Sequence, residues 1–185
     1  MMTDFISLDG SGDAVLAVEG PDTQRTVRFL ISTKVLSLAS PVFAKMFGPD
    51  FQEGHKIRCG ERIQVELGDD DSLAMEVILK ALHYHKPNQC PVDAERLASI
   101  AVHCDKYDCT GALSSWISYW FNNLTPITRR PEDLGFLLLA AYNFDDAEQF
   151  KEISARALRG LTLDFPLAWK SYNILSLIPE NIQST

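Results

Sequence analysis

The stretch from Val27 to Glu53 constrains the fold of this chain more than any other part of the sequence. It begins with Val-Arg-Phe-Leu-Ile, in which apolar side chains recur at every second position, as in a strand that buries one face. The hydroxyl of Ser32 or of Thr33 can then cap a short helix, and Ser40 can cap a second one that opens with Pro41. Helices this short are not stable alone, so we expect the pair to bury its apolar side against other elements.

Two further strands are predicted on either side of this stretch. Residues 13–19 place Leu16 and Val18 on one face and pair with the next strand as a hairpin, and residues 63–67 show the same alternation. The residues before position 13 contain Gly, Ser and Asp with few apolar side chains, so we expect a loose lead-in there. Residues 54–61 are expected to form a polar loop. The expected sheet therefore has three strands.

Helical spacing of apolar residues, together with capping residues, predicts the elements that follow. The acidic cluster Asp69-Asp70-Asp71 is interpreted as a solvated helix start, and Asp93 as the cap of the next helix. The segment from Thr125 to Pro131 is the best candidate for a domain boundary, because it combines prolines with arginines. Further helices are expected to begin near Thr110, at Pro131, at Asp145 or Asp146 and near Phe165.

Within the opening stretch, the order of residue classes resembles that of the BTB/POZ family. The matching positions are Phe29, Ile31, Val35-Leu36, Ser40, Phe43, Met46-Phe47, Phe51 and Glu53. Many members of this family carry a histidine where Ser32 stands, so features linked to that histidine do not transfer to this chain. The segment from His103 to Cys109 also resembles one that is common in BTB proteins of filamentous fungi.

The resemblance implies an α+β fold, with a small three-stranded sheet capped by a cluster of about five helices and followed by a C-terminal helical extension. We expect the BTB/POZ domain to span residues 13–124 and the extension to span residues 131–180. The longer form of this domain carries an extra leading helix that swaps between subunits in dimers. The short N-terminal segment leaves little room for such a helix, so a monomer or a weak homodimer is expected.

The charge balance of the chain argues against nucleic acid as a partner. The net charge is −8 and the pI is near 4.9, whereas phosphate binding depends on clustered lysine and arginine. The sequence shows neither a basic leader followed by an apolar stretch nor a run of about eighteen apolar residues, so we expect no membrane span and a cytoplasmic or nuclear location. In a reducing compartment the cysteines at 59, 90, 104 and 109 are interpreted as free thiols.

The sequence contains no set of residues that predicts catalysis. The phosphate-binding, nucleophile-elbow and zinc-protease motifs are absent from it. One alternative is a zinc site built from His83, His85, His103, Cys104 and Cys109, because imidazole and thiolate are the usual zinc ligands. The simpler interpretation is that His83 and His85 bond carbonyls at a helix end and that Cys104 packs in an apolar stripe. We therefore expect a non-enzymatic protein without a metal or a cofactor.

The resemblance implies a protein-interaction adaptor that links partners to a cullin-type ubiquitin ligase. In cullin-binding family members, a hydrophobic residue and a Glu separated by one residue follow the helical hairpin, and Phe51-Gln52-Glu53 has this pattern. Such a loop can insert an aromatic anchor into a partner while the carboxylate fixes its orientation. The predicted partner-binding residues are Phe47, Phe51, Glu53, Tyr84 and Tyr107. The simpler interpretation of Phe51 is that it closes the local core over Met46 and Phe47. The alternative function is an oligomerisation scaffold for transcriptional or signalling complexes without a ubiquitin role.

Overall fold

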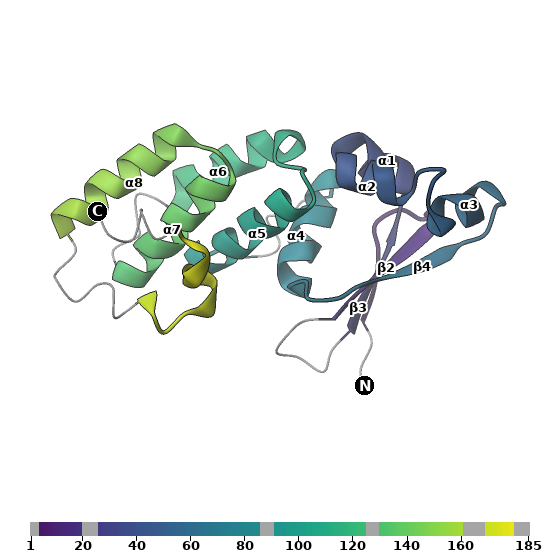
Figure 1. Ribbon diagram of the computed structural model, residues 1–185, viewed down its shortest axis with the longest axis horizontal. Coiled ribbons are helices and arrows are strands. Elements are labelled where there is room, and N and C mark those ends of the chain that lie inside the picture. The colour runs from purple at the N-terminus through teal and green to yellow at the C-terminus, as the bar shows by residue number, and fades with distance from the viewer. Residues whose placement is uncertain (1–3, 20–25, 86–90, 125–129, 161–168, 180–185) are drawn as a thin grey trace. The chain divides into compact units, whose positions relative to one another are not determined.

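The computed structural model describes residues 4–19, 26–85, 91–124, 130–160 and 169–179 (Figure 1). These residues form a mixed α/β structure with one four-stranded sheet and eight α-helices, as expected for the α+β class. The chain divides into two compact units, one comprising Met1–Cys90 with Lys106–Ser114, the other Pro91–Asp105 with Ser115–Thr185. The domain bounds 13–124 and 131–180 remain predictions.

The sheet belongs to the first unit and has the strand order β1-β3-β2-β4. Its strands are β1 (Asp4–Ser7), β2 (Ala14–Glu19), β3 (Thr26–Ile31) and β4 (Ile63–Leu67). The central pair β2 and β3 is antiparallel, while β1 pairs with β3 and β4 pairs with β2 in parallel. The three predicted strands are therefore confirmed, and the turn predicted between β2 and β3 lies outside the described residues.

The expected loose lead-in and the expected three-stranded sheet are wrong, because β1 adds a fourth strand. The amide of Leu8 donates to the Leu30 carbonyl at 2.9 Å, and the Leu8 side chain is buried. A side chain at Gly12 would collide with the carbonyl of Ile31 at 2.7 Å, so glycine lets this segment lie against β3. The strand is short and lies at the sheet edge, with Phe5 59% exposed, and so it leaves no alternating pattern in the sequence.

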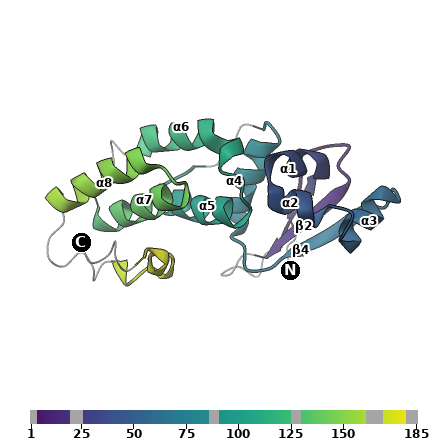
Figure 2. The ribbon, with the colours of Figure 1, turned by 45° about the horizontal axis from the view of Figure 1, so that its top comes forward.

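Four α-helices belong to the first unit. They are α1 (Thr33–Ala39), α2 (Pro41–Met46), α3 (Gln52–Arg58) and α4 (Ser72–Leu82), and α1 and α2 lie over one face of the sheet (Figures 1 and 2). Ser40 caps α2 as predicted, since its Oγ accepts from the Phe43 amide at 3.0 Å. The predicted hydroxyl cap of α1 is wrong: Asp13 takes this role and accepts from the Thr33 amide at 2.8 Å and from its hydroxyl at 2.6 Å.

The predicted polar loop at residues 54–61 is also wrong, because most of it belongs to α3. This helix is polar on most sides and therefore shows no apolar stripe in the sequence. It lies close to the end of α2, where a side chain at Gly54 would collide with the carbonyl oxygens of Phe47 and Gly48. The helix ends in a Schellman arrangement at Gly60, whose φ of 80° suits glycine. Backbone contact, and not a hydrophobic face, fixes α3.

The remaining helices are α5 (Ala94–Lys106), a 3₁₀ turn at Gly111–Leu113, α6 (Ser114–Leu124), α7 (Pro131–Asn143), α8 (Ala147–Gly160) and a 3₁₀ turn at Asn173–Leu177. Two predicted caps are confirmed: Asp93 accepts from the Arg96 amide at 2.8 Å, and Asp146 accepts from the Gln149 amide at 3.0 Å. The helix start at Thr110 is wrong in detail, because a 3₁₀ turn comes first and the Thr110 side chain caps nothing. The last predicted helix is the second 3₁₀ turn in its described part.

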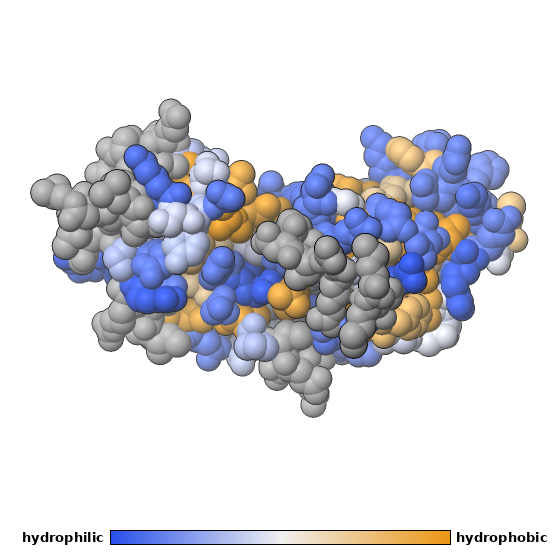
Figure 3. All heavy atoms as spheres, turned by 90° about the horizontal axis from the view of Figure 1, so that it is seen from below, coloured by the Kyte–Doolittle hydropathy of each residue, from blue (hydrophilic) through white to orange (hydrophobic). Residues whose placement is uncertain are grey.

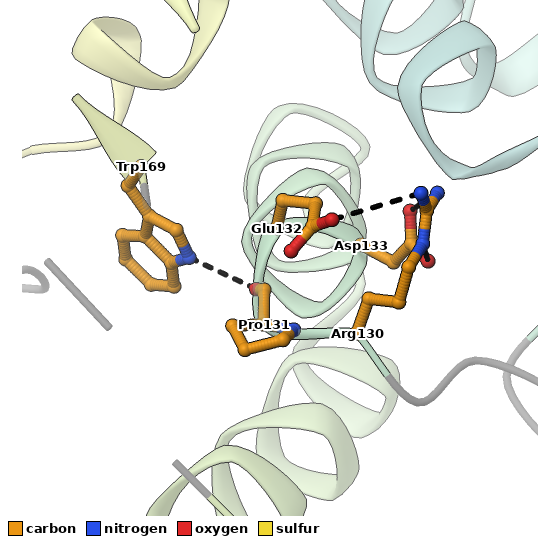
Figure 4. A network of polar contacts seen from close by, with 5 residues as sticks. All are labelled: Arg130, Pro131, Glu132, Asp133 and Trp169. Atoms are coloured by element: carbon orange, nitrogen blue, oxygen red, sulfur yellow. Dashed lines mark hydrogen bonds and ion pairs between the residues drawn. The ribbon is translucent and has the colours of Figure 1, made fainter. Parts of the chain in front are cut away.

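The second unit is built around α7, whose residues 134–141 are all buried. Trp169 packs over its first turns, donating from Nε1 to the Pro131 carbonyl at 2.9 Å (Figure 4). A side chain at Gly135 would meet the Trp169 ring at 2.7 Å, so this glycine makes room for the indole. Beside them Arg130 pairs with Asp133 at 2.7 Å and with Glu132 at 3.6 Å on the exposed side of the helix start (Figure 4).

Candidate protein-binding surface

The first unit carries all five residues predicted to contact a partner, but they differ in exposure. Phe51 is 41% exposed and Tyr84 is 93% exposed, whereas Phe47 and Glu53 are partly buried. Tyr107 is only 3% exposed, so its side chain supports the surface from beneath and is not part of it. The exposed candidates lie at the start of α3 and just after α4.

Tyr107 is the centre of a buried hydrogen-bond network. Its hydroxyl donates to Asp70 at 2.5 Å, its carbonyl accepts from the Ser40 hydroxyl, and Lys106 pairs with the same carboxylate at 2.5 Å. Burial and the hydrogen bond to Asp70 raise the pKa of the Tyr107 phenol, so the hydroxyl stays protonated as a donor. The interpretation of Asp70 as a solvated residue is wrong, because it is fully buried; the adjacent Asp71 caps α4 from the surface.

An aromatic stack connects this hydrogen-bond network to the predicted partner surface. The Phe43 ring lies parallel to that of Tyr107 with 4.6 Å between centroids, and the Phe47 ring lies parallel to that of Phe43 at 6.0 Å. The structure thus brings Phe47 and Tyr107 into one column, with the buried Phe43 between them. Because rings packed in this way have little freedom, Phe47 is held in place at the end of α2.

Phe51 and Glu53 lie where the chain passes from α2 to α3, a segment that we call the α2–α3 corner. Phe51 is the N-cap residue of α3, and its amide donates to the Gly48 carbonyl at 3.3 Å. Glu53 lies in the first turn of α3, where the free amides of a helix start favour a carboxylate. It also lines a shallow depression of about 210 Å³ whose other charged residues are Lys56, Glu61 and Arg62. The corner thus offers an apolar ring beside a charged rim.

Tyr84 occupies an unusual backbone conformation at the end of α4. Its φ is 60°, in the left-handed region that few bulky residues adopt. The turn is a Schellman motif, with the Tyr84 amide donating to Ala81 at 3.1 Å and the His85 amide to Lys80 at 2.8 Å. Glycine is the usual residue at this position. A tyrosine here projects an aromatic ring fully into solvent.

Two apolar residues missed by the sequence analysis extend the exposed surface of the helix pair. Leu38 on α1 is 81% exposed and Val42 on α2 is 37% exposed. Helical geometry could have indicated Leu38, because it lies two positions after the buried Leu36 and so on the opposite side of the helix. On the face of the molecule seen in Figure 3, hydrophobic residues occur in small areas among hydrophilic ones.

The histidines considered as zinc ligands instead hold backbone groups in place. His83 donates from Nδ1 to the Leu79 carbonyl at 2.9 Å and accepts at Nε2 from the Ser32 amide at 3.1 Å. His85 donates from Nε2 to the Leu8 carbonyl at 2.7 Å, and Nδ1 of His103 bonds the Ser99 carbonyl at 2.7 Å. Among the described residues no group of three or more His, Cys, Asp or Glu side chains could hold a metal. Cys59, Cys104 and Cys109 take part in no disulfide among the described residues.

No protein-family model matches the chain, and no curated protein matches it either. Within the part of the chain that the structure describes, none of the helices combines the length and the apolar character needed to cross a membrane.

Proposed function

We propose that this chain is a BTB/POZ-type adaptor that binds a cullin-type scaffold through the α2–α3 corner. The observation that carries the proposal is the exposed Phe51 ring beside Glu53 on a helix fixed by backbone contact at Gly54. An aromatic side chain next to a carboxylate is the combination that an anchor and its orienting group require. The scaffold would be met in the cytoplasm or the nucleus.

The packing beneath the corner supports this proposal. Phe47 is held by the aromatic stack on Phe43 and Tyr107, so the end of α2 is ordered before any partner arrives. A preformed surface loses less conformational entropy on binding, which leaves more of the contact energy as affinity. Leu38 and Val42 add exposed apolar area on the same helix pair. Tyr84 would contribute a separate contact, since a strained and exposed aromatic residue suggests a role in recognition.

The test compares a double variant with a matched control. Phe51→Ala combined with Glu53→Lys should remove the anchor and reverse the charge, and we expect a loss of about 2 kcal/mol or more of binding free energy to a cullin scaffold in calorimetry. Phe5→Ala removes another exposed ring from the same unit and should leave this binding unchanged. Circular dichroism of both variants checks the fold. Equal binding by the double variant and the natural chain would show that the corner does not bind the scaffold.

A second candidate function is an oligomerisation scaffold without a ubiquitin role. The observation that favours it is that β1 lies at the edge of the sheet and that its Phe5 side chain is 59% exposed. Edge strands of this kind pair with other chains. Sedimentation equilibrium of the natural chain and of Phe5→Lys distinguishes the two functions. Self-association that Phe5→Lys abolishes, together with no binding to a cullin, would favour the scaffold.

A further inference from the structure

The second unit contains a depression that the proposed adaptor function does not use. It has a volume of about 630 Å³ and lies around the turn between α7 and α8, with Asp105 near the end of α5 on its rim. This volume is within the range of about 300–1,000 Å³ that is usual for ligand sites. Its lining includes Ala141, Tyr142 and Phe150, which supply apolar surface, and three aspartates, which supply charge.

The described charged side chains that line the depression are all acidic. Asp105, Asp145 and Asp146 line it, and among the residues that the structure describes neither a lysine nor an arginine does. Asp146 uses Oδ1 to cap α8, accepting from the Gln149 amide at 3.0 Å. Asp105 and Asp145 are exposed, and their carboxylates pair with no cation among the described residues. Two carboxylates therefore remain available to a ligand.

The backbone that carries one of these carboxylates, that of Asp145, has a fixed conformation. Asp145 has a φ of 56° and is the left-handed residue of a Schellman motif that ends α7. Its amide donates to the Tyr142 carbonyl at 3.1 Å, and the Asp146 amide donates to the Ala141 carbonyl at 2.9 Å. The turn thus fixes the backbone from which the side chains of Asp145 and Tyr142 project.

Aromatic surface beside carboxylates favours a particular kind of ligand. Tyr142 is 50% exposed and Phe150 is partly exposed, and both line the depression. The face of an aromatic ring attracts an organic cation, and more strongly when a carboxylate is near. A long basic side chain also has an apolar stem that can lie along Ala141 and the rings while its head meets the acids. A metal ion fits less well, because no group of three ligating side chains occurs among the described residues.

We infer that this depression binds an arginine or lysine side chain from a basic segment of a partner protein. The stem lies over Ala141, the charged head bonds the carboxylates of Asp105 and Asp145, and the rings of Tyr142 and Phe150 flank it. The inference does not depend on the α2–α3 corner or on a cullin. It gives the second unit a recruiting surface of its own.

The experiment uses a fluorescent tri-arginine peptide as the probe, with a tri-citrulline peptide of the same shape and no charge as its counterpart. The double variant D105N/D145N is compared with D69N/D108N in fluorescence anisotropy. The control is matched, because Asp69 and Asp108 are exposed, lie outside the depression and have positive φ like Asp145. Asparagine tolerates that conformation as aspartate does. Both variants therefore lose two negative charges without strain.

We expect the natural chain to bind tri-arginine and not tri-citrulline. D105N/D145N should weaken binding by about tenfold or more, while D69N/D108N should change it by no more than about twofold. Tyr142→Leu, which keeps an apolar side chain but removes the ring, should weaken binding by about threefold. An equal loss in the two double variants would show non-specific attraction to an acidic chain and would overturn the inference. Unchanged binding by D105N/D145N, or equal binding of tri-citrulline, would overturn it as well.

Discussion

The two units of this chain are specified by different kinds of interaction. In the first unit, hydrogen bonds join segments that are far apart in the sequence: Asp13 to Thr33, His83 to Ser32, and Tyr107 to both Ser40 and Asp70. In the second unit, the described polar side chains mostly bond carbonyls one turn away, as His103 and Asn143 do. Apart from the hydrogen bond from Trp169 to the Pro131 carbonyl, its distant segments meet through rings, in the pairs Phe121 with Phe144 and Phe136 with Tyr172.

This difference predicts different sensitivities. A hydrogen bond has a direction, so a buried hydrogen-bond network fixes one arrangement of its side chains. Removing a single partner from it leaves a buried polar group unsatisfied and lowers stability. Apolar packing has no direction but contributes in proportion to the area that is buried. The first unit should therefore respond to pH and to the removal of single polar atoms. The second unit should respond chiefly to the loss of side-chain volume.

The largest expected effect is in the second unit. Phe136 is 1% exposed and packs edge-on against Tyr172 with 5.0 Å between centroids. Phe136→Ala removes this ring and leaves a cavity, and should lower the free energy of unfolding by about 3–5 kcal/mol. Urea denaturation followed by tryptophan fluorescence measures it, since all three tryptophans lie in this unit.

Leu158→Ala is the matched control for this prediction. Leu158 lies on α8 in the same unit but is 71% exposed, so its truncation should change stability by less than about 0.5 kcal/mol. If Phe136→Ala were as mild as this control, apolar burial would not be what holds the second unit together.

A smaller effect is expected at the buried hydrogen-bond network of the first unit. Tyr107→Phe removes one donor from the fully buried Asp70 carboxylate and should lower the free energy of unfolding by about 1–3 kcal/mol. Combining it with Asp70→Asn in a double-mutant cycle should give a coupling of more than about 0.5 kcal/mol. Far-UV circular dichroism during urea denaturation measures both. Tyr119→Phe, at a 48% exposed position, is the control.

The dependence of stability on pH should also come from the first unit. Burial lowers the pKa of His83, although the hydrogen bond to Leu79 and the charge of Asp9 oppose this and His85 adds to it. The unfolded chain therefore binds more protons below about pH 6.5, and stability should fall as the pH falls from there toward the folded pKa. The loss is about 1.4 kcal/mol for each unit by which the pKa is lowered.

The geometry gives this dependence its physical reason. Nε2 of neutral His83 accepts from the Ser32 amide at 3.1 Å, and a proton added there would face that N–H donor. His83→Gln removes the titration, so the difference in stability between about pH 7.5 and about pH 5.5 should shrink. His55→Gln, at an exposed position on α3, serves as the matched control. A drop that is unchanged in His83→Gln would place the pH sensitivity elsewhere.

The elements that could be predicted from the sequence are those set by neighbouring residues. Ser40 and Pro41 define the start of α2 within four residues, and the alternation of residues 27–31 defines β3. The cap of α1 was missed because Asp13 lies 20 residues before Thr33. The strand β1 was missed for a related reason, since its place depends on pairing with β3 and not on its own side chains.

The candidate surface divides in the same way. The position of Phe51 and Glu53 after the helix pair could be predicted, because it follows from the local order of residues. The burial of Tyr107 could not, since it depends on Asp70, which lies 37 residues away. The depression on the second unit was missed because its rim combines Asp105 with a turn about forty residues later, which no local pattern connects.

The smallest expected effect compares one backbone motif in the two units. Tyr84 ends α4 and Asp145 ends α7, and both have positive φ in a Schellman motif. Tyr84→Gly should raise the free energy of unfolding by about 1 kcal/mol, because glycine has no Cβ to oppose this conformation. Asp145→Gly should raise it by less, since aspartate tolerates positive φ better than tyrosine. Thermal and urea denaturation of both variants measure the difference.

Measuring stability and binding together separates backbone strain at Tyr84 from a contact of its ring with a partner. If Tyr84 contacts a partner, Tyr84→Gly should produce a more stable chain that binds that partner more weakly, because the ring is lost while the strain is relieved. Gly60→Ala, the reverse change at the end of α3, should destabilise the chain, since alanine would have to adopt a φ of 80°. A Tyr84→Gly variant that gains no stability would show that the turn accommodates tyrosine without strain, and the backbone would then no longer support a role for this ring in recognition.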